Sequence, residues 1–315
     1  MIEKLKTKFS NRDSLIHTLK ELFPYLGLIL LAVLFALTTN GKFLRPSNLM
    51  TILKQSVIVM IGAMGSSFVL AHGNMDFSIG GEMALCCLLS YYVSQLNPYL
   101  MLPACILIGM LLSLIVSVVH VVIGVPAFVS GMCVMFIGKG IVQSVSGSGL
   151  TCPPMYNTLD KTWFYVCTLV FVLAVTYILF NSTKIGRYNR LIGSNPEASF
   201  LSGIDTRKFK VLAFLTSGFC VGIASFLTIV RGGGVSAQTG ASFEMDTIIV
   251  LTLGGAPLSG GSGVKLRSAL LGALTYFVLS NGLVIWGVNA EIIFAIKGIL
   301  FLTIVALTFD RSNKV

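Results

Sequence analysis

The sequence has little charge: only 11% of its 315 residues are Asp, Glu, Lys or Arg, whereas a soluble domain carries about 25%. So few charged side chains cannot coat a surface that faces water. Hydrophobic residues reach 55%, and the mean hydropathy is +0.89. These values exclude an ordinary soluble enzyme, a disordered chain and a nucleic-acid-binding domain.

Sequence motifs for three kinds of chemistry are missing as well. The seven cysteines form no C-x-x-C pair and only Cys152 lies in a probable loop, which indicates packing rather than a disulfide framework. The histidines His17, His72 and His120 are too far apart to suggest a metal site. No G-x-x-x-x-G-K-[ST] phosphate loop occurs. We therefore expect no enzymatic activity, no bound cofactor and no metal in this chain itself.

Ten apolar segments account for most of the chain. Most are 18 to 26 residues long, enough to cross a hydrocarbon core of about 30 Å as a helix. The sequence predicts an all-α, polytopic membrane protein with about ten transmembrane helices. The segments lie at about 22–39, 52–71, 77–95, 98–123, 125–145, 163–181, 211–230, 244–258, 268–286 and 288–309.

Two of these segments have unusual ends. The 244–258 segment is short and ends in Gly-Gly-Ala-Pro, so we expect a partial or broken span there. Segments 98–123 and 125–145 are separated only by Gly124 and Pro126, which predicts a tight turn.

Lysine and arginine residues indicate the orientation. With ten spans and a cytoplasmic N-terminus, fifteen of them fall in inside segments and four fall outside. This excess agrees with the positive-inside rule. Residues 1–21 are basic and polar and do not resemble a cleaved signal peptide. We expect a cytoplasmic tail at 1–21, a transmembrane domain at 22–309 with a cytoplasmic loop at about 182–210, and a cytoplasmic tail at 310–315.

The cytoplasmic loop contains the signals of a short helix. Asn195 can cap it, Pro196 suits its first position, and Glu197 suits its first turn. Gly203 is the expected stop signal. We predict a helix at Asn195–Ser202, which is too short to be stable without a docking surface on this protein or another. On these cues alone, an ordinary capped helix in a loop is the other interpretation.

Acidic residues at membrane depth are the second group of candidates. A charge in the bilayer is costly, so such residues face protein or water. Asp76 lies in a turn with Asn74 and Ser78, and its carboxylate can cap the next helix through the amides of Ser78 and Ile79. Contact with a passing solute is the alternative role for Asp76.

Three further acids lie in or at the start of spans. Glu82 lies one turn into the third span, where it either forms a packed hydrogen bond or lines a path. Glu244 and Asp246 begin the eighth span near the outer face, where the helix dipole favours acids. A role at the mouth of a pathway or in docking a partner is the alternative for this pair.

Four stretches of the sequence resemble one family of transport proteins. Gly193–Ile204 resembles the cytoplasmic coupling loop of the ATP-binding-cassette importer permeases of the ribose, galactose and xylose type. Gly73–Gly81 resembles the G-x-x-D-L-S-V-G signature of that family, and Gly240–Gly263 resembles its late glycine-rich signature. Asn281–Gly298 resembles its final two spans, so the match covers about residues 45 to 310. The chain departs from the family at Val125–Cys133, where I-P-A-F-I-A-T-L-G is frequent, and it lacks a glutamine near 291–293.

The resemblance implies a permease subunit that moves a monosaccharide across the bacterial cytoplasmic (inner) membrane. It implies a vitamin-B12-importer-like (type II) fold, a second permease subunit, two ATPase subunits that bind ATP and Mg, and an extracytoplasmic sugar-binding protein, but no nucleic acid. Coupling to the ATPase subunit is thereby assigned to Gly193, Asn195, Pro196, Glu197, Ala198 and Gly203. The pathway or structural-turn candidates are Asn74, Asp76, Ser78, Glu82, Glu244 and Asp246.

An ion-coupled secondary transporter of a small polar solute is the competing function, because acids at membrane depth can form ion sites. A membrane enzyme is disfavoured, since the loops carry no pair of nucleophile and base. The cargo stays open among a pentose, a hexose and the furanosyl signal autoinducer-2, which related permeases import. The choice between homodimer and heterodimer also stays open.

Overall fold

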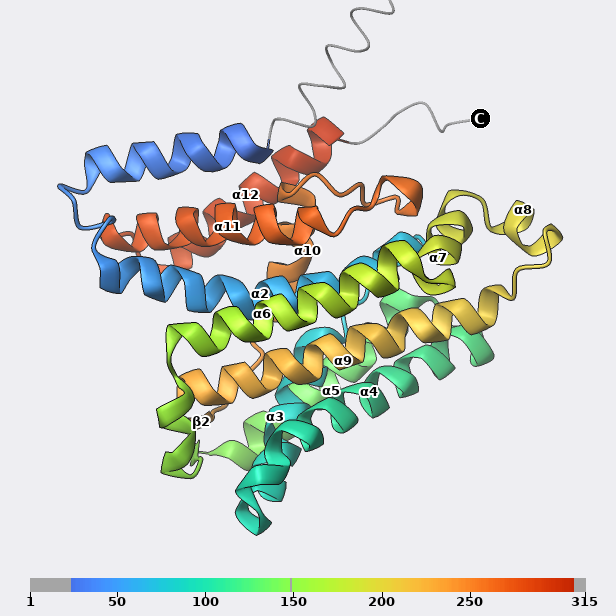
Figure 1. Cartoon of the computed structure of the whole chain (residues 1–315), viewed down its shortest axis with the longest axis horizontal. Helices are drawn as coiled ribbons and strands as arrows, with labels where there is room; N and C mark the ends of the chain where they lie inside the picture. The colour runs from blue at the N-terminus through green and yellow to red at the C-terminus, as the bar shows by residue number, and fades with distance from the viewer. Residues whose placement is uncertain (1–23, 148, 309–315) are drawn as a thin grey trace, which may run out of the picture.

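Each of the ten predicted apolar segments coincides with a helix in the computed structural model, which describes residues 24–147 and 149–308 (Figure 1). The predicted tails at 1–21 and 310–315 lie outside the described residues. The helices are Pro24–Thr38, α2 (Pro46–Ala71), α3 (Ile79–Leu96), α4 (Met101–Val118), α5 (Ala127–Ser146), α6 (Thr162–Tyr177), α9 (Thr206–Gly232), α10 (Phe243–Leu253), α11 (Arg267–Ile285) and α12 (Ala290–Thr308).

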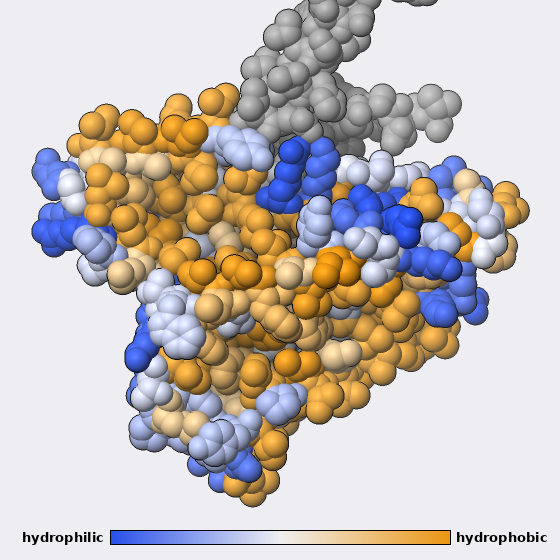
Figure 2. Space-filling model, viewed as in Figure 1, coloured by the Kyte–Doolittle hydropathy of each residue, from blue (hydrophilic) through white to orange (hydrophobic). Residues whose placement is uncertain are grey.

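Within the described residues, six helical stretches are long and apolar enough to cross a membrane. Apolar side chains form a broad belt over the helices, and polar side chains collect at the two ends of the molecule (Figure 2). This distribution fits a polytopic membrane protein. The six stretches are Pro46–Ala71, Pro98–Ile123, Ala127–Ser146, Thr162–Ser182, Thr206–Gly232 and Arg267–Ile285.

Helices α2 and α9 form the centre of the bundle, and both are largely buried. Helix α4 packs closely on α9 because the residues between them are small. A Cβ at Gly109 of α4 would lie 2.5 Å from the Gly218 carbonyl oxygen, and one at Gly222 would lie 2.5 Å from the Cys105 carbonyl oxygen. Such small-residue contacts let backbones approach in a bilayer, where apolar burial gives helices little reason to associate.

The predicted tight turn between the fourth and fifth segments is present. Helix α4 ends in a wider π-helical turn at Val119–Ile123, and Gly124 follows with φ of +88°. Pro126 then precedes the first residue of α5. The left-handed conformation at Gly124 reverses the chain without a longer loop.

Helix α10 has only 11 residues, so the expectation of a partial span is confirmed. It begins inside the bundle: the Phe243 ring packs against Gly62, which lies about one turn past the middle of α2. Just before it, Gly240 adopts φ of +75° and lies against the Gly80 carbonyl group of α3. The prediction that Glu244 and Asp246 lie near the outer face is therefore wrong, because the glycine-rich segment before α10 carries the chain deep between the helices.

Two features at opposite ends of the bundle complete the fold. At one end, β1 (Leu150–Thr151) pairs antiparallel with β2 (Gly234–Val235) and ties two loops together. This strand pair is a small departure from the predicted all-α fold. At the other end, α7 (Lys184–Ser194) lies beside the end of α9, and α8 (Pro196–Leu201) projects beyond it (Figure 1). We call the end of the bundle with the strand pair the β-ribbon end, and the end with α8 the α8 end.

Candidate functional site

The predicted helix at Asn195–Ser202 is present as α8. The Asn195 side-chain oxygen accepts a hydrogen bond of 2.9 Å from the Ala198 amide, so Asn195 is the N-cap. Pro196 occupies the first turn, and Glu197 is its acidic residue. After the C-cap at Ser202, Gly203 has φ of +78°, which ends the helix. Local cap chemistry alone accounts for both ends of α8.

Helix α7 attaches α8 to the bundle. A Cβ at Gly193 would collide with the Ala71 carbonyl oxygen, so α7 touches the end of α2 directly. The Asn189 side-chain amide donates to the Phe209 carbonyl oxygen of α9 at 3.1 Å. The Ser194 hydroxyl accepts from the Ser262 amide at 3.1 Å. Gly193, predicted as a coupling residue, is thus a packing position at the base of the projection rather than part of its exposed surface.

The far side of α8 is exposed and apolar. The exposed fractions of Phe200 and Leu201 are 69% and 83%. Within residues 24–147 and 149–308, these two large apolar side chains are not packed into the core, and an exposed apolar patch of this kind marks an interaction surface. The geometry therefore suits docking of a protein partner at the α8 end.

Removal of the N-cap is expected to loosen α8. In Asn195→Ala the Ala198 amide loses its acceptor, which costs about 1 kcal/mol, or roughly fivefold in local opening. Hydrogen exchange of the amides at 198–203 should accelerate by that factor while the amides of α9 stay protected. Asn195→Asp keeps the acceptor and is the matched control. Equal exchange in the alanine variant and the wild type would contradict the capping role.

Asp76 and Glu82 share one buried polar cluster with Ser78 and Ser113. The Asp76 carboxylate accepts from the Ser78 amide at 2.8 Å, one of its two predicted capping bonds, and also contacts the Ser78 hydroxyl. The same hydroxyl lies 2.8 Å from a Glu82 oxygen, and the Ser113 hydroxyl donates to the other at 2.6 Å. The Ser78 hydroxyl therefore lies between the two carboxyl groups and joins them into one cluster.

Asn74 extends this turn toward α4. Its side-chain amide donates to His72 Nδ1 at 3.0 Å and to His120 Nε2 at 3.2 Å. His120 Nδ1 lies 2.8 Å from the Val125 carbonyl oxygen and so carries the hydrogen, which leaves Nε2 as the acceptor. Asn74, Asp76 and Ser78 therefore lie in a packed turn between α2 and α3, and Glu82 in the first turn of α3 connects this turn to α4.

The two acids of α10 point to different neighbours. A Glu244 oxygen lies 2.7 Å from Lys139 Nζ of α5, and the rest of its carboxylate lies against Gly80. Asp246 accepts a hydrogen bond from the Tyr276 hydroxyl of α11 and lies 3.9 Å from Lys297 Nζ of α12. Both acids are in the first turn of α10, where the helix dipole favours them, as the sequence predicts.

A cavity of about 890 Å³ opens at the β-ribbon end. Its walls come from α2, the end of α9, the β ribbon and the segment before α10, and Phe243 and Phe277 add aromatic surface. Of the six pathway or turn candidates, Asp246 alone lines this cavity. Its longer polar side chains are Gln55, Asn157, Arg231, Gln238 and Asp246.

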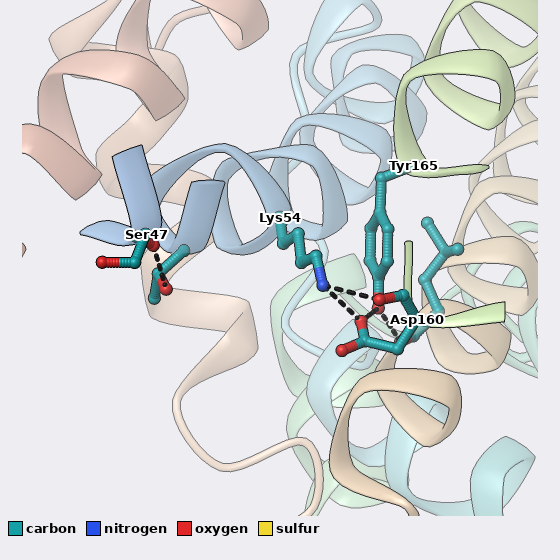
Figure 3. A network of polar contacts seen from close by, with 6 residues as sticks. Ser47, Lys54, Asp160 and Tyr165 are labelled. Atoms are coloured by element: carbon teal, nitrogen blue, oxygen red, sulfur yellow. Dashed lines mark hydrogen bonds and ion pairs between the residues drawn. The ribbon is translucent and has the colours of Figure 1, made fainter. Parts of the chain in front are cut away.

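An ion pair fastens the loop that supplies Asn157 to the wall of this cavity (Figure 3). Lys54 Nζ of α2 lies 3.0 Å from the Asp160 carboxylate and donates to the Asp160 carbonyl oxygen at 2.8 Å. The Tyr165 hydroxyl of α6 donates to the same carboxylate at 2.9 Å. Sequence reasoning missed Lys54, Lys139 and Arg231 as site residues. The available signal was a lone cation inside or at the edge of an apolar segment.

Comparison with known proteins finds one matching family profile and several similar transport proteins. The profile described as "Branched-chain amino acid transport system / permease component" matches residues 48–305. The chain is 28% identical to the ribose import permease protein of Bacillus subtilis (strain 168), over 99% of both chains. It is 30% identical to the ribose import permease protein of Haemophilus influenzae, over 82% of this chain and 84% of the relative.

A galactofuranose transporter permease protein of Escherichia coli (strain K12) is 25% identical, over 82% of this chain and 79% of the relative. No solved structure matches the chain. The profile covers most of the chain, including all the helices from α3 to α11, and the projecting helix, the broken helix and the apolar belt fit a transporter subunit. The chain therefore belongs to the permease family of the branched-chain amino acid transport system.

Proposed function

We propose that this chain is the permease subunit of an ATP-binding-cassette importer that moves a monosaccharide into the cell. Ten membrane-crossing helices in a vitamin-B12-importer-like (type II) arrangement carry the cargo, with α10 as a broken span. Both termini and α8 face the cytoplasm, as the excess of basic residues on that side favours. The relatives named as ribose and galactofuranose permeases support a sugar as cargo.

The proposed transporter contains other subunits besides this chain. A second permease subunit lies beside this chain, two ATPase subunits bind ATP and Mg at the α8 end, and an extracytoplasmic binding protein delivers the sugar at the β-ribbon end. ATP binding in the ATPase subunits pulls on α8, and α7 transmits this motion because it is fixed to α2 and α9. Pairing of Glu244 with Lys139 and of Asp246 with Lys297 also supports the importer over an ion-coupled carrier, whose acids must receive an ion.

The observation that carries this proposal is the exposed apolar face of α8. Affinity capture of the tagged chain from mild detergent, followed by mass spectrometry, should recover an ATPase of the cassette type and an exported binding protein. Phe200→Ala with Leu201→Ala should reduce the recovered ATPase roughly tenfold, because apolar anchors at an interface contribute most of its affinity. The amount of permease in the membrane should not change, since both side chains are exposed.

Leu96→Ala is the matched control, because Leu96 is 88% exposed at the β-ribbon end. This variant should retain the ATPase in full. Recovery of the chain without any ATPase, repeated after cross-linking, would contradict the proposed function. Equal losses in the Leu96 and α8 variants would contradict docking through α8.

A further inference from the structure

We propose that the cavity at the β-ribbon end is a binding site for a monosaccharide within the permease itself, with Asp246 at its inner end and Arg231 and Gln238 on its walls. The inference rests on the proposed function and adds to it a second point of selection after the binding protein. The cavity volume of about 890 Å³ is at the upper end of the range for small-molecule sites, and it leaves room for a sugar with part of its hydration water.

The polar side chains of the cavity match the chemistry of a sugar. Each sugar hydroxyl both donates and accepts a hydrogen bond. Arg231 supplies donors only, and the Asp246 carboxylate supplies acceptors only. The amides of Gln55, Asn157 and Gln238 supply both, and they come from separate elements around the cavity. A site with this mixture can bind several hydroxyl groups of one ring at once.

Aromatic surface completes the match. Phe243 and Phe277 line the same cavity, so apolar ring faces lie beside the polar groups. The C–H face of a sugar ring packs on such surface while its hydroxyl groups bind at the edge. This combination of apolar walls and a few convergent polar groups is typical of small-molecule sites.

Asp246 is held in position for contact with a ligand. The Tyr276 hydroxyl and Lys297 lie on its carboxylate, and the Lys297 ammonium packs 4.2 Å from the centre of the Tyr276 ring. The Asp246 side chain nevertheless keeps 21% of its surface exposed, and it lines the cavity. A carboxylate that is already oriented loses little conformational entropy when a ligand binds, which favours its use as an anchor.

The position of the cavity also suits a site at which a solute is held on the transport pathway. Its inner end is at the start of α10, level with the middle of α2, where Ile58 and Val59 line it. From Thr247 to Leu253 the residues of α10 are buried, so this helix closes the way toward the α8 end. A solute that enters from the β-ribbon end therefore stops beside Asp246 until α10 moves.

Direct binding tests the site without any partner. The full chain in lipid nanodiscs is examined by saturation-transfer NMR with D-ribose, D-galactose and L-leucine, each offered separately. We expect transfer to the sugar ring protons and none to leucine. Asp246→Asn and Gln238→Ala should each weaken the sugar signal about fivefold, the effect of one lost hydrogen bond. Gln238 is exposed, so its variant tests the site even if Asp246→Asn impairs folding.

Two variants outside the cavity are the matched controls: Glu291→Gln removes an exposed acid of α12, and Gln143→Ala truncates an exposed glutamine of α5. Both should bind sugar as the wild type does. Absence of sugar binding to a wild-type chain that still recovers its ATPase would overturn the inference and leave the proposed function standing. Transfer to leucine in place of the sugars, or equal losses in the control variants, would overturn it as well.

Discussion

Replacement of Gly193 by alanine is expected to destabilise the α8 end by about 3 kcal/mol, the upper range for a methyl group forced into a packed site. The new Cβ would meet the Ala71 carbonyl oxygen and would lie 2.8 Å from the Gly261 amide nitrogen. Both atoms belong to backbone, which cannot swing away as a side chain can. Helix α7 must therefore shift from α2, and α8 loses its rigid attachment.

Gly203→Ala is the contrasting variant. A Cβ at Gly203 would meet nothing within 4 Å, so this change introduces no collision. The cost is limited to the positive φ of +78°, about 1 kcal/mol for an alanine. The effect should also stay local, since the residue follows the exposed end of α8. We therefore expect normal melting of the bundle in Gly203→Ala and early melting in Gly193→Ala.

The cysteines of the chain provide the measurement. Five of them are buried and react with a thiol-specific dye only as the chain unfolds: Cys86, Cys87, Cys105, Cys152 and Cys220. Cys133 and Cys167 are exposed, so serine replaces them in every variant. Burial raises the pKa of the Cys152 thiol to about 11, which keeps this loop thiol protonated and slow to react near neutral pH.

In this assay Gly193→Ala should melt about 6 °C or more below the background variant. A melting temperature equal to that of the background would show that α7 can move away from Ala71 at no cost. The attachment of α7 to α2 would then not be the rigid connection between α8 and the bundle.

The sequence predicts helices well where the signal is local. Long apolar segments alone predict the ten helices, and Asn195, Pro196 and Gly203 predict both ends of α8 because capping involves only neighbouring residues. Helix α7 was not predicted. It has 11 mostly polar residues, including two glycines, but Ile185, Tyr188 and Ile192 recur at helical spacing, so an amphipathic pattern was the signal available in the sequence. Its stability comes from tertiary contacts such as the one from Asn189 to Phe209.

The site could be predicted only in part, because its geometry depends on distant pairs. Hydropathy locates the start of an apolar segment but not its depth, and the depth of α10 depends on the contact between Gly240 and Gly80. Lys54 and Asp160 are 106 positions apart, and Lys139 and Glu244 are 105 apart. Without an alignment, no pattern in one sequence pairs such residues. The cavity is therefore a finding of the structure, with Asp246 its one predicted member.

Loss of the Lys139 cation is the second change with a large expected effect. In Lys139→Met the Glu244 carboxyl group, whose side chain is 7% exposed, loses its cationic partner at 2.7 Å. An uncompensated buried charge costs about 3 kcal/mol. The start of α10 should then separate from α5, and the chain should melt about 6 °C or more below the wild type in the thiol assay.

A second substitution tests whether the charge is the cause. Glu244→Gln keeps the shape of the side chain against Gly80 but removes the buried charge, so Lys139→Met with Glu244→Gln should be more stable than Lys139→Met alone. Glu244→Gln by itself should cost less than Lys139→Met, because the Lys139 side chain is 29% exposed and can reach water. If the double variant melted below Lys139→Met, with the two losses simply adding, the pair would have no energetic coupling. Packing against Gly80 and Gly62, rather than the ion pair, would then hold α10 at its depth in the bundle.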